Sequence, residues 1–136
     1  MNEMDILKKI LLHCTRMGAR LFRCNTGTGW VGTNQYRMPD GSLVLKNPVP
    51  FRSGLVGGGS DLIGWKSVEI TPDMVGRKVA VFHAIEVKAK RGIVSEDQKV
   101  FIANVKAAGG IIGVARSEED YDQIVTEFLS RNRAGV

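Results

Sequence analysis

The sequence is poor in the residues that mark several protein classes. It has only two cysteines and two histidines, and neither pair shows the spacing of a zinc site or of a C-x-x-C redox motif. Aromatic residues make up 7% of the chain, too few for a surface of rings that stack on nucleic-acid bases. No apolar run approaches the ~18 residues that a membrane-spanning helix needs. These scarcities argue against a zinc module, a base-stacking platform and an integral membrane protein.

The first residues predict an intracellular protein, and that location bears on the two cysteines. Acids at Glu3 and Asp5 interrupt the N-terminal segment and no long apolar region follows, so we expect no secretory signal and a cytoplasmic location. A disulfide between Cys14 and Cys24 is possible by count, but an intracellular location favours free thiols.

What the chain does contain fits a globular domain that binds a polyanion. A length of 136 residues suits one domain with its own core, so we predict a single domain over residues 1–136. Hydrophobic residues at 43% and charged residues at 24% are ordinary for such a domain. The net charge of +5 favours a polyanionic partner such as a nucleic acid, although it says nothing about the fold.

The N-terminal half combines a regular start with an irregular middle. Apolar residues at helical spacing predict an amphipathic helix over residues 3–17, and alternating side chains predict a short strand over 19–24. Glycines and prolines keep residues 25–60 irregular, with one candidate hairpin in which Trp30–Val31 and Leu43–Leu45 flank a turn near Pro39–Gly41. We interpret this region as a functional loop on a compact scaffold.

Two longer strands are expected after the irregular region. They cover residues 61–70 and 78–88, are separated by a turn over 71–76, and are predicted to pair antiparallel. The run 79–85 is apolar on both faces except at His83, which fits a central strand buried on both sides. We interpret His83 as a hydrogen-bonded core residue.

Two helices follow these strands. The second helix of the chain begins at Ser95, whose spacing to Gln98 is that of a capping box, and it ends at Gly109–Gly110. The third helix begins at Ser117, and we expect residues 131–136 to fray at its end.

Between these helices lies a short apolar strand over residues 111–115. A right-handed crossover through the second helix should make it parallel to the strand at 82–88. The sequence therefore predicts an α/β fold with a mixed central β-sheet flanked by helices.

Three ionisable residues stand out against this background. Asp61 follows a glycine-rich turn, and Glu86 and Lys88 lie two residues apart at the end of the most apolar run. Alternate residues of a strand share a face, so Glu86 and Lys88 point the same way, and Asp61 reaches that face if the two strands pair. Two carboxylates and an ammonium on a rigid sheet can bind a divalent metal and act on a phosphodiester.

Each of these residues also has a purely structural interpretation. Glu86 and Lys88 would form a salt bridge where the strand leaves the core, and Asp61 is a common turn residue. Gln98 completes the capping box, and Glu3 complements the dipole of the first helix. Residue chemistry alone leaves both interpretations open.

The combined layout resembles the VRR-NUC (virus-type replication-repair nuclease) domain of the PD-(D/E)XK nuclease superfamily, in its small stand-alone phage form. The resemblance runs from about residue 2 to residue 117, and it departs from the family in having Ser60 where proline often precedes the acid. The matching pieces are Glu3, Arg23-Cys24-Asn25 with Gly27, Gly59-Ser60-Asp61-Leu62, Ile85-Glu86-Val87-Lys88, Gln98 and Ala108-Gly109-Gly110.

The resemblance implies a restriction-endonuclease-like core in the order α-β-β-β-α-β-α and a Mg²⁺- or Mn²⁺-dependent DNA endonuclease. It implies that Asp61 and Glu86 are metal ligands, assisted by the Val87 backbone carbonyl and by Glu3. It also implies that Lys88 is the catalytic lysine and that Gln98 belongs to the active site.

The same resemblance implies branched DNA, such as four-way junctions or flaps, as the substrate, and a homodimer or higher homo-oligomer in a bacterial or phage-infected cell. Residues near the implied site are predicted to hold DNA phosphates without reading sequence. These residues are Arg23, Asn25, Arg37, Lys46, Arg52, Lys90 and Arg91.

Two other functions are compatible with the sequence. One is a non-catalytic nucleic-acid-binding protein on the same fold, although two carboxylates facing phosphates would repel DNA without a metal. The other is a sequence-specific restriction-type nuclease, for which the chain offers no recognition insert beyond residues 25–57.

Overall fold

The computed structural model describes residues 2–134, which contain three α-helices and a set of small β-sheets. The fold is therefore mixed α/β, as predicted. The chain divides into two compact units, residues 1–64 and 65–136, and each is described by itself. No described helix is both long and apolar enough to cross a membrane.

The first unit begins with helix α1, Glu3–Arg16, close to the predicted bounds. Asn2 caps it through a capping box: its side chain accepts from the Asp5 amide at 2.9 Å, and the Asp5 carboxylate accepts from the Asn2 amide at 3.3 Å. Gly18, at φ 74°, allows the chain to turn from α1 into the next strand. Cys14 and Cys24 are free thiols.

Strand β1, Ala19–Arg23, pairs with β6, Leu62–Lys66, so α1 and the two ends of the first unit meet around this pair. The strand predicted over 61–70 therefore ends at Lys66. Gly64 lies so close to β1 that a Cβ at this position would stand 1.8 Å from the Arg20 carbonyl oxygen. This close approach explains why β6 carries a glycine in the middle of a strand.

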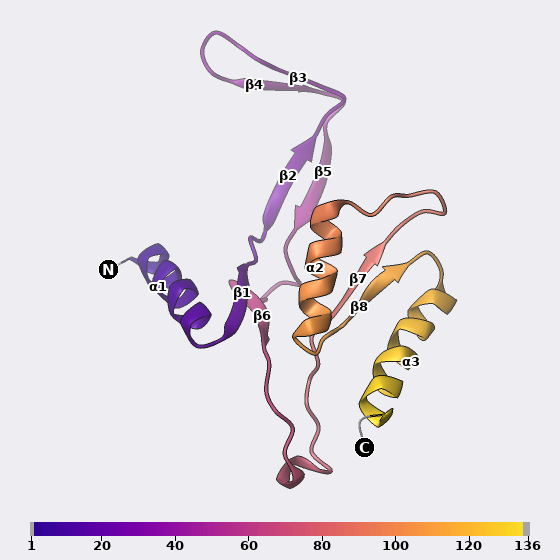
Figure 1. Cartoon of the computed structure of the whole chain (residues 1–136). Coiled ribbons are helices and arrows are strands. Elements are labelled where there is room, and N and C mark those ends of the chain that lie inside the picture. Colours follow the sequence, from indigo (N-terminus) through magenta and orange to yellow (C-terminus); the bar gives the residue numbers. More distant parts are fainter. Residues whose placement is uncertain (1, 135–136) are drawn as a thin grey trace. The chain divides into compact units, whose positions relative to one another are not determined.

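The region expected to be irregular is a two-stranded β-ribbon in two tiers, which corrects the prediction for residues 25–60 (Figure 1). The inner tier pairs β2, Gly27–Val31, with β5, Val49–Ser53; the outer tier pairs β3, Asn34–Arg37, with β4, Leu43–Lys46. The outer turn closes at Pro39–Gly41, as predicted, but Trp30 and Val31, predicted to flank it, pair with Pro50 and Val49 in the inner tier. Glycines and prolines weaken the strand signal of the inner tier, so the pattern alone did not reveal it.

The second unit is built around β7, His83–Val87, and β8, Ile111–Ala115, which pair in parallel as predicted. Helix α2, Glu96–Ala107, connects them, and helix α3, Glu118–Ala134, follows (Figure 1). Both helices pack on β8. The antiparallel partner predicted for β7 is not among the ladders of the described residues, because each sheet there has two strands.

Strand β7 is shorter than the predicted strand over 78–88. It begins only at His83, and the 3₁₀ turn η1, Pro72–Met74, occupies the predicted turn before it. His83 is exposed and stacks on the Tyr121 ring at a centroid distance of 5.5 Å, so its prediction as a core residue was wrong. The apolar run had suggested a strand buried on both faces, but its first residues have no regular structure.

The core of the second unit lies between the two helices and β8. Val105 of α2 is fully buried, and Ile112 and Ala115 of β8 are also buried. The lack of a side chain at Gly113 leaves space for Ile124 of α3, because a Cβ at position 113 would stand 2.6 Å from the isoleucine side chain. The small residues of β8 thus allow the helix to pack closely.

Residues 131–136 were predicted to fray, and part of this tail is helical in the structure. Residues 131–134 belong to the helix, whereas residues 135–136 lie outside the described part of the chain. The single central sheet and its order of elements remain predictions.

Gly64→Ala is expected to destabilise the protein by about 1–3 kcal/mol, because the new methyl group would force β6 away from the Arg20 carbonyl. Urea unfolding measures the change. Gly57→Ala is the matched control: a Cβ there meets no described heavy atom within 4 Å, so its effect should stay within about 0.5 kcal/mol. Equal stabilities for the two variants would contradict the β1–β6 packing.

Candidate active site

An ion pair links two of the predicted catalytic residues in the second unit. The Lys88 ammonium lies 3.0 Å from Glu86 Oε1, which confirms that the two side chains share a face of β7. Both side chains are half-buried, with 20% of Lys88 and 28% of Glu86 exposed. The contact is therefore screened less than a surface salt bridge.

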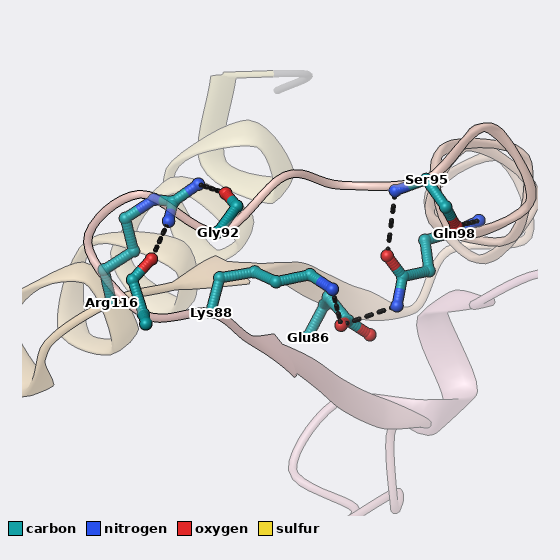
Figure 2. A network of polar contacts seen from close by, with 7 residues as sticks. Glu86, Lys88, Gly92, Ser95, Gln98 and Arg116 are labelled. Carbon is teal, nitrogen blue, oxygen red and sulfur yellow. Dashed lines mark hydrogen bonds and ion pairs between the residues drawn. The ribbon is translucent and has the colours of Figure 1, made fainter.

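Gln98 joins this pair from the first turn of α2 (Figure 2). Its side-chain nitrogen donates to the same Glu86 Oε1 at 2.7 Å, while its side-chain oxygen accepts from the Ser95 amide at 2.9 Å. The Ser95 hydroxyl in turn accepts from the Gln98 amide at 3.2 Å. The helix cap and the contact with Glu86 therefore use the two ends of one amide, so the structural and functional interpretations of Gln98 do not exclude each other.

The geometry leaves one carboxylate oxygen open. Both side-chain contacts of Glu86 within the described part of the chain fall on Oε1, and Oε2 takes neither of them. A carboxylate that is oriented through one oxygen and open at the other can offer that oxygen to a hard cation such as Mg²⁺. The salt bridge expected from the structural interpretation is thus present, and it does not occupy the whole carboxylate.

Arg116 holds the turn that follows Lys88, a role that its place in the sequence did not suggest to us. Its guanidinium donates to the Ala89 carbonyl and, at 2.8 Å, to the Gly92 carbonyl (Figure 2). The turn is also closed by the Gly92 amide, which donates to Ala89 at 2.8 Å. The parallel register, in which Val87 pairs with Ala115, sets Arg116 beside Lys88.

The first unit gathers a second group of predicted residues around a cleft of about 520 Å³. Glu3 comes from the first turn of α1 and Arg23 from the end of β1. Asn25 lies two residues after β1, and Asp61 directly precedes β6. The Asp61 carbonyl accepts from the Cys24 amide at 2.8 Å, which ties the two lining segments together. Two carboxylates and a guanidinium therefore line one cleft, a composition suited to a cation and a phosphate.

The carboxylates at these two places are hard oxygen donors, which suit a divalent cation such as Mg²⁺ or Mn²⁺ better than a softer metal that prefers thiolate or imidazole ligands. No three His, Cys, Asp or Glu side chains of residues 2–134 converge as a ready ligand cluster. Mg²⁺ keeps several waters and is commonly bound through one or two carboxylates and substrate phosphates, so it needs no such cluster. Glu86 in the second unit, and Glu3 and Asp61 in the first, each offer oxygen ligands of this kind.

The other residues predicted to hold DNA lie on exposed turns and strands. Lys90 and Arg91 form the tip of the turn that Arg116 holds. Arg37, Lys46 and Arg52 lie on the β-ribbon, and their residues are exposed.

Comparison with known families gives one match. Residues 50–119, just over half of the chain, match the family described as the VRR-NUC domain. The matched span includes Asp61, Glu86 and Lys88, and Gln98 as well. No curated protein matches the chain, and neither does any solved structure.

Arg116→Ala is expected to speed amide hydrogen exchange at Gly92 by about tenfold, because the turn loses two hydrogen bonds from one side chain. Exchange followed by NMR measures the rate. Arg77→Ala, an exposed arginine outside this turn, is the control and should leave Gly92 unchanged. If both variants exchange like the parent protein, Arg116 does not hold the turn.

Proposed function

The chain belongs to the VRR-NUC domain family, whose members are nucleases of the PD-(D/E)XK type, and on that premise we propose that it is a Mg²⁺- or Mn²⁺-dependent DNA endonuclease. The observation that carries the proposal is the Glu86 carboxylate, which Lys88 and Gln98 orient through one oxygen. A restriction-endonuclease-like core over residues 1–136 is part of this proposal.

The metal ligands in this proposal are Asp61, Glu86 and the Val87 carbonyl, with Glu3 as a further acid. The family match spans Asp61 and Glu86 together, and Glu3 lines the same cleft as Asp61. A bound Mg²⁺ or Mn²⁺ would neutralise charge on the phosphate and lower the pKa of a coordinated water.

Lys88 is proposed to stabilise the phosphate during cleavage. Its ammonium is held at 3.0 Å from Glu86, so it is positioned before DNA arrives and needs little reorganisation. When a scissile phosphate enters, its oxygens can accept from the same ammonium, which keeps two further donors beyond the one shared with Glu86. Charge that develops on the phosphate then meets a fixed cation rather than bulk water.

Gln98 is proposed to keep the carboxylate of Glu86 in the binding orientation. The helix cap holds the side-chain oxygen of its amide, so the nitrogen that faces Glu86 cannot rotate away without breaking the contact with Ser95. Gln98 and Lys88 therefore both restrain the Glu86 carboxylate. The carboxylate therefore stays in place when Lys88 turns to the phosphate.

Branched DNA in a bacterial or phage-infected cytoplasm is the proposed substrate. The net charge of +5 supports a polyanion, and the exposed cations on the ribbon and on the turn after Lys88 can contact phosphates without reading bases. A symmetric four-way junction presents two equivalent strands to be cut, so we propose that the protein acts as a homodimer or a higher homo-oligomer.

A cleavage panel tests the proposal. Labelled four-way junction, flap, duplex and single-stranded DNA are incubated with the protein and Mg²⁺, Mn²⁺ or EDTA. We expect cutting of branched DNA with either metal and none in EDTA. Asp61→Ala and Lys88→Met should each lower the rate by about 100-fold or more, because each removes charge stabilisation at the phosphate.

The matched control is Glu96→Gln, which removes an exposed carboxylate near the start of the same helix as Gln98. It should cut like the parent protein, and circular dichroism should show that all variants are folded. Binding of DNA without cutting, with an affinity in EDTA that equals or exceeds the affinity with metal, would favour the non-catalytic alternative. Cutting that persists in both Asp61→Ala and Lys88→Met would contradict the assigned site.

A further inference from the structure

The β-ribbon is an exposed element whose only role in the proposed function is the contact of its cations with DNA phosphates. Both tiers are ladders of only two strands, and large side chains on them stand in solvent, with 57% of Trp30 and 62% of Val49 exposed. Strands β2, β3 and β4 also precede residue 50, where the family match begins. The ribbon is therefore largely an addition to the matched nuclease segment.

The charge of the ribbon is mostly of one sign. Between residues 27 and 53 the cations are Arg37, Lys46 and Arg52, and Asp40 is the sole acid. The hydroxyl and the amide of Ser42 donate to the Asp40 carboxylate, and they hold the pKa of Asp40 below its usual value. The acid at the tip is thus already engaged within its own turn.

The register of the outer tier shows which of its polar side chains lie on the same face of the ribbon. Asn34 pairs with Lys46 and Tyr36 pairs with Val44, so Asn34, Tyr36 and Lys46 share one face. Amide, hydroxyl and ammonium groups are those that hydrogen-bond to base edges in a DNA groove. Arg37 lies on the other face and reaches the turn, where it donates to the Gly41 carbonyl at 3.2 Å.

The bend between the two tiers is fixed by hydrogen bonds. The amide of Thr33 donates to the Lys46 carbonyl at 2.9 Å, and its hydroxyl donates to the same carbonyl at 3.3 Å. Asn47, at φ 49°, donates from its side chain to the Thr33 hydroxyl at 3.3 Å. An element with a fixed bend loses little conformational freedom when it binds.

We propose that this ribbon, Gly27–Ser53, inserts into the major groove of duplex DNA. A two-stranded β-ribbon fits the roughly 12 Å width of that groove. The face of Asn34, Tyr36 and Lys46 meets base edges, and Arg37 and Arg52 meet phosphates. The inference rests on the proposed function in taking DNA as the substrate, and it adds how a duplex arm is held.

The spacing of the cations agrees with a groove contact. Leu43, the partner of Arg37, and Arg52 are nine residues apart along the chain, so at the rise of a strand they are at most roughly 30 Å apart, and the bend at Asn47 shortens this distance. Cations within such a span can neutralise phosphates within about one helical turn of DNA. A second copy of the chain is a poorer partner for the ribbon than DNA, because two ribbons of like charge would repel each other.

Binding measured without cleavage tests the inference. Fluorescence anisotropy of a labelled duplex and of a four-way junction is recorded in EDTA over a range of salt concentrations. Arg37→Ala/Arg52→Ala is expected to weaken binding roughly 10- to 100-fold and to lower the salt slope by about two, because two phosphates are no longer neutralised. Arg77→Ala/Lys78→Ala removes the same charge from an exposed segment of the second unit and should leave both values unchanged.

Groove ligands test the groove itself. Methyl green, which occupies the major groove, should compete with the protein, whereas netropsin, which occupies the minor groove, should not. Asn34→Ala should weaken binding and leave the salt slope unchanged, because it removes a base contact and no charge. Competition by netropsin alone would contradict the major-groove assignment.

The remaining outcomes separate this inference from the proposed function. If the parent protein binds DNA through the ribbon but cuts nothing with either metal, the inference holds and the nuclease proposal fails. If it cuts DNA while Arg37→Ala/Arg52→Ala binds with parent affinity, the inference fails. If sedimentation shows that this variant only loses its self-association, the ribbon is a contact between copies and the inference also fails.

Discussion

The double contact at Glu86 Oε1 joins the fold of the second unit to its proposed chemistry. Lys88 reaches this oxygen from the same strand, and Gln98 reaches it from the first turn of α2. Because the other end of the Gln98 amide caps the helix through Ser95, the position of α2 and the orientation of the carboxylate are set together. Gln98, which caps the helix, thereby also orients the Glu86 carboxylate that we propose as a metal ligand.

The parts of this site that the sequence predicts are those set by short-range rules. Strand alternation predicts that Glu86 and Lys88 share a face, and the capping-box spacing predicts the contact between Ser95 and Gln98. The crossover rule predicts the parallel pair of β7 and β8. The contact between Gln98 and Glu86 needs the packing of α2, so no local pattern could establish it.

Other features escaped prediction for physical reasons. The inner tier of the ribbon holds glycines and Pro50, which lower strand propensity, and its pairing joins segments about twenty residues apart. Arg116 acts through backbone carbonyls, which carry no sequence signature. His83 was expected in the core because its neighbours are apolar, yet it lies at the exposed start of β7 against Tyr121. In each case tertiary context decided the outcome.

Paramagnetic broadening by Mn²⁺ in NMR spectra of the ¹⁵N-labelled protein tests most directly whether Glu86 is a prepared metal ligand. We predict that the amide signals of Asp61, Glu86 and Val87 broaden together at substoichiometric Mn²⁺ and recover when Mg²⁺ is added in excess. Glu86→Gln should abolish this joint response. Broadening confined to other acids, such as Glu118–Asp120 at the start of α3, with Glu86 unaffected, would contradict a metal site at Glu86.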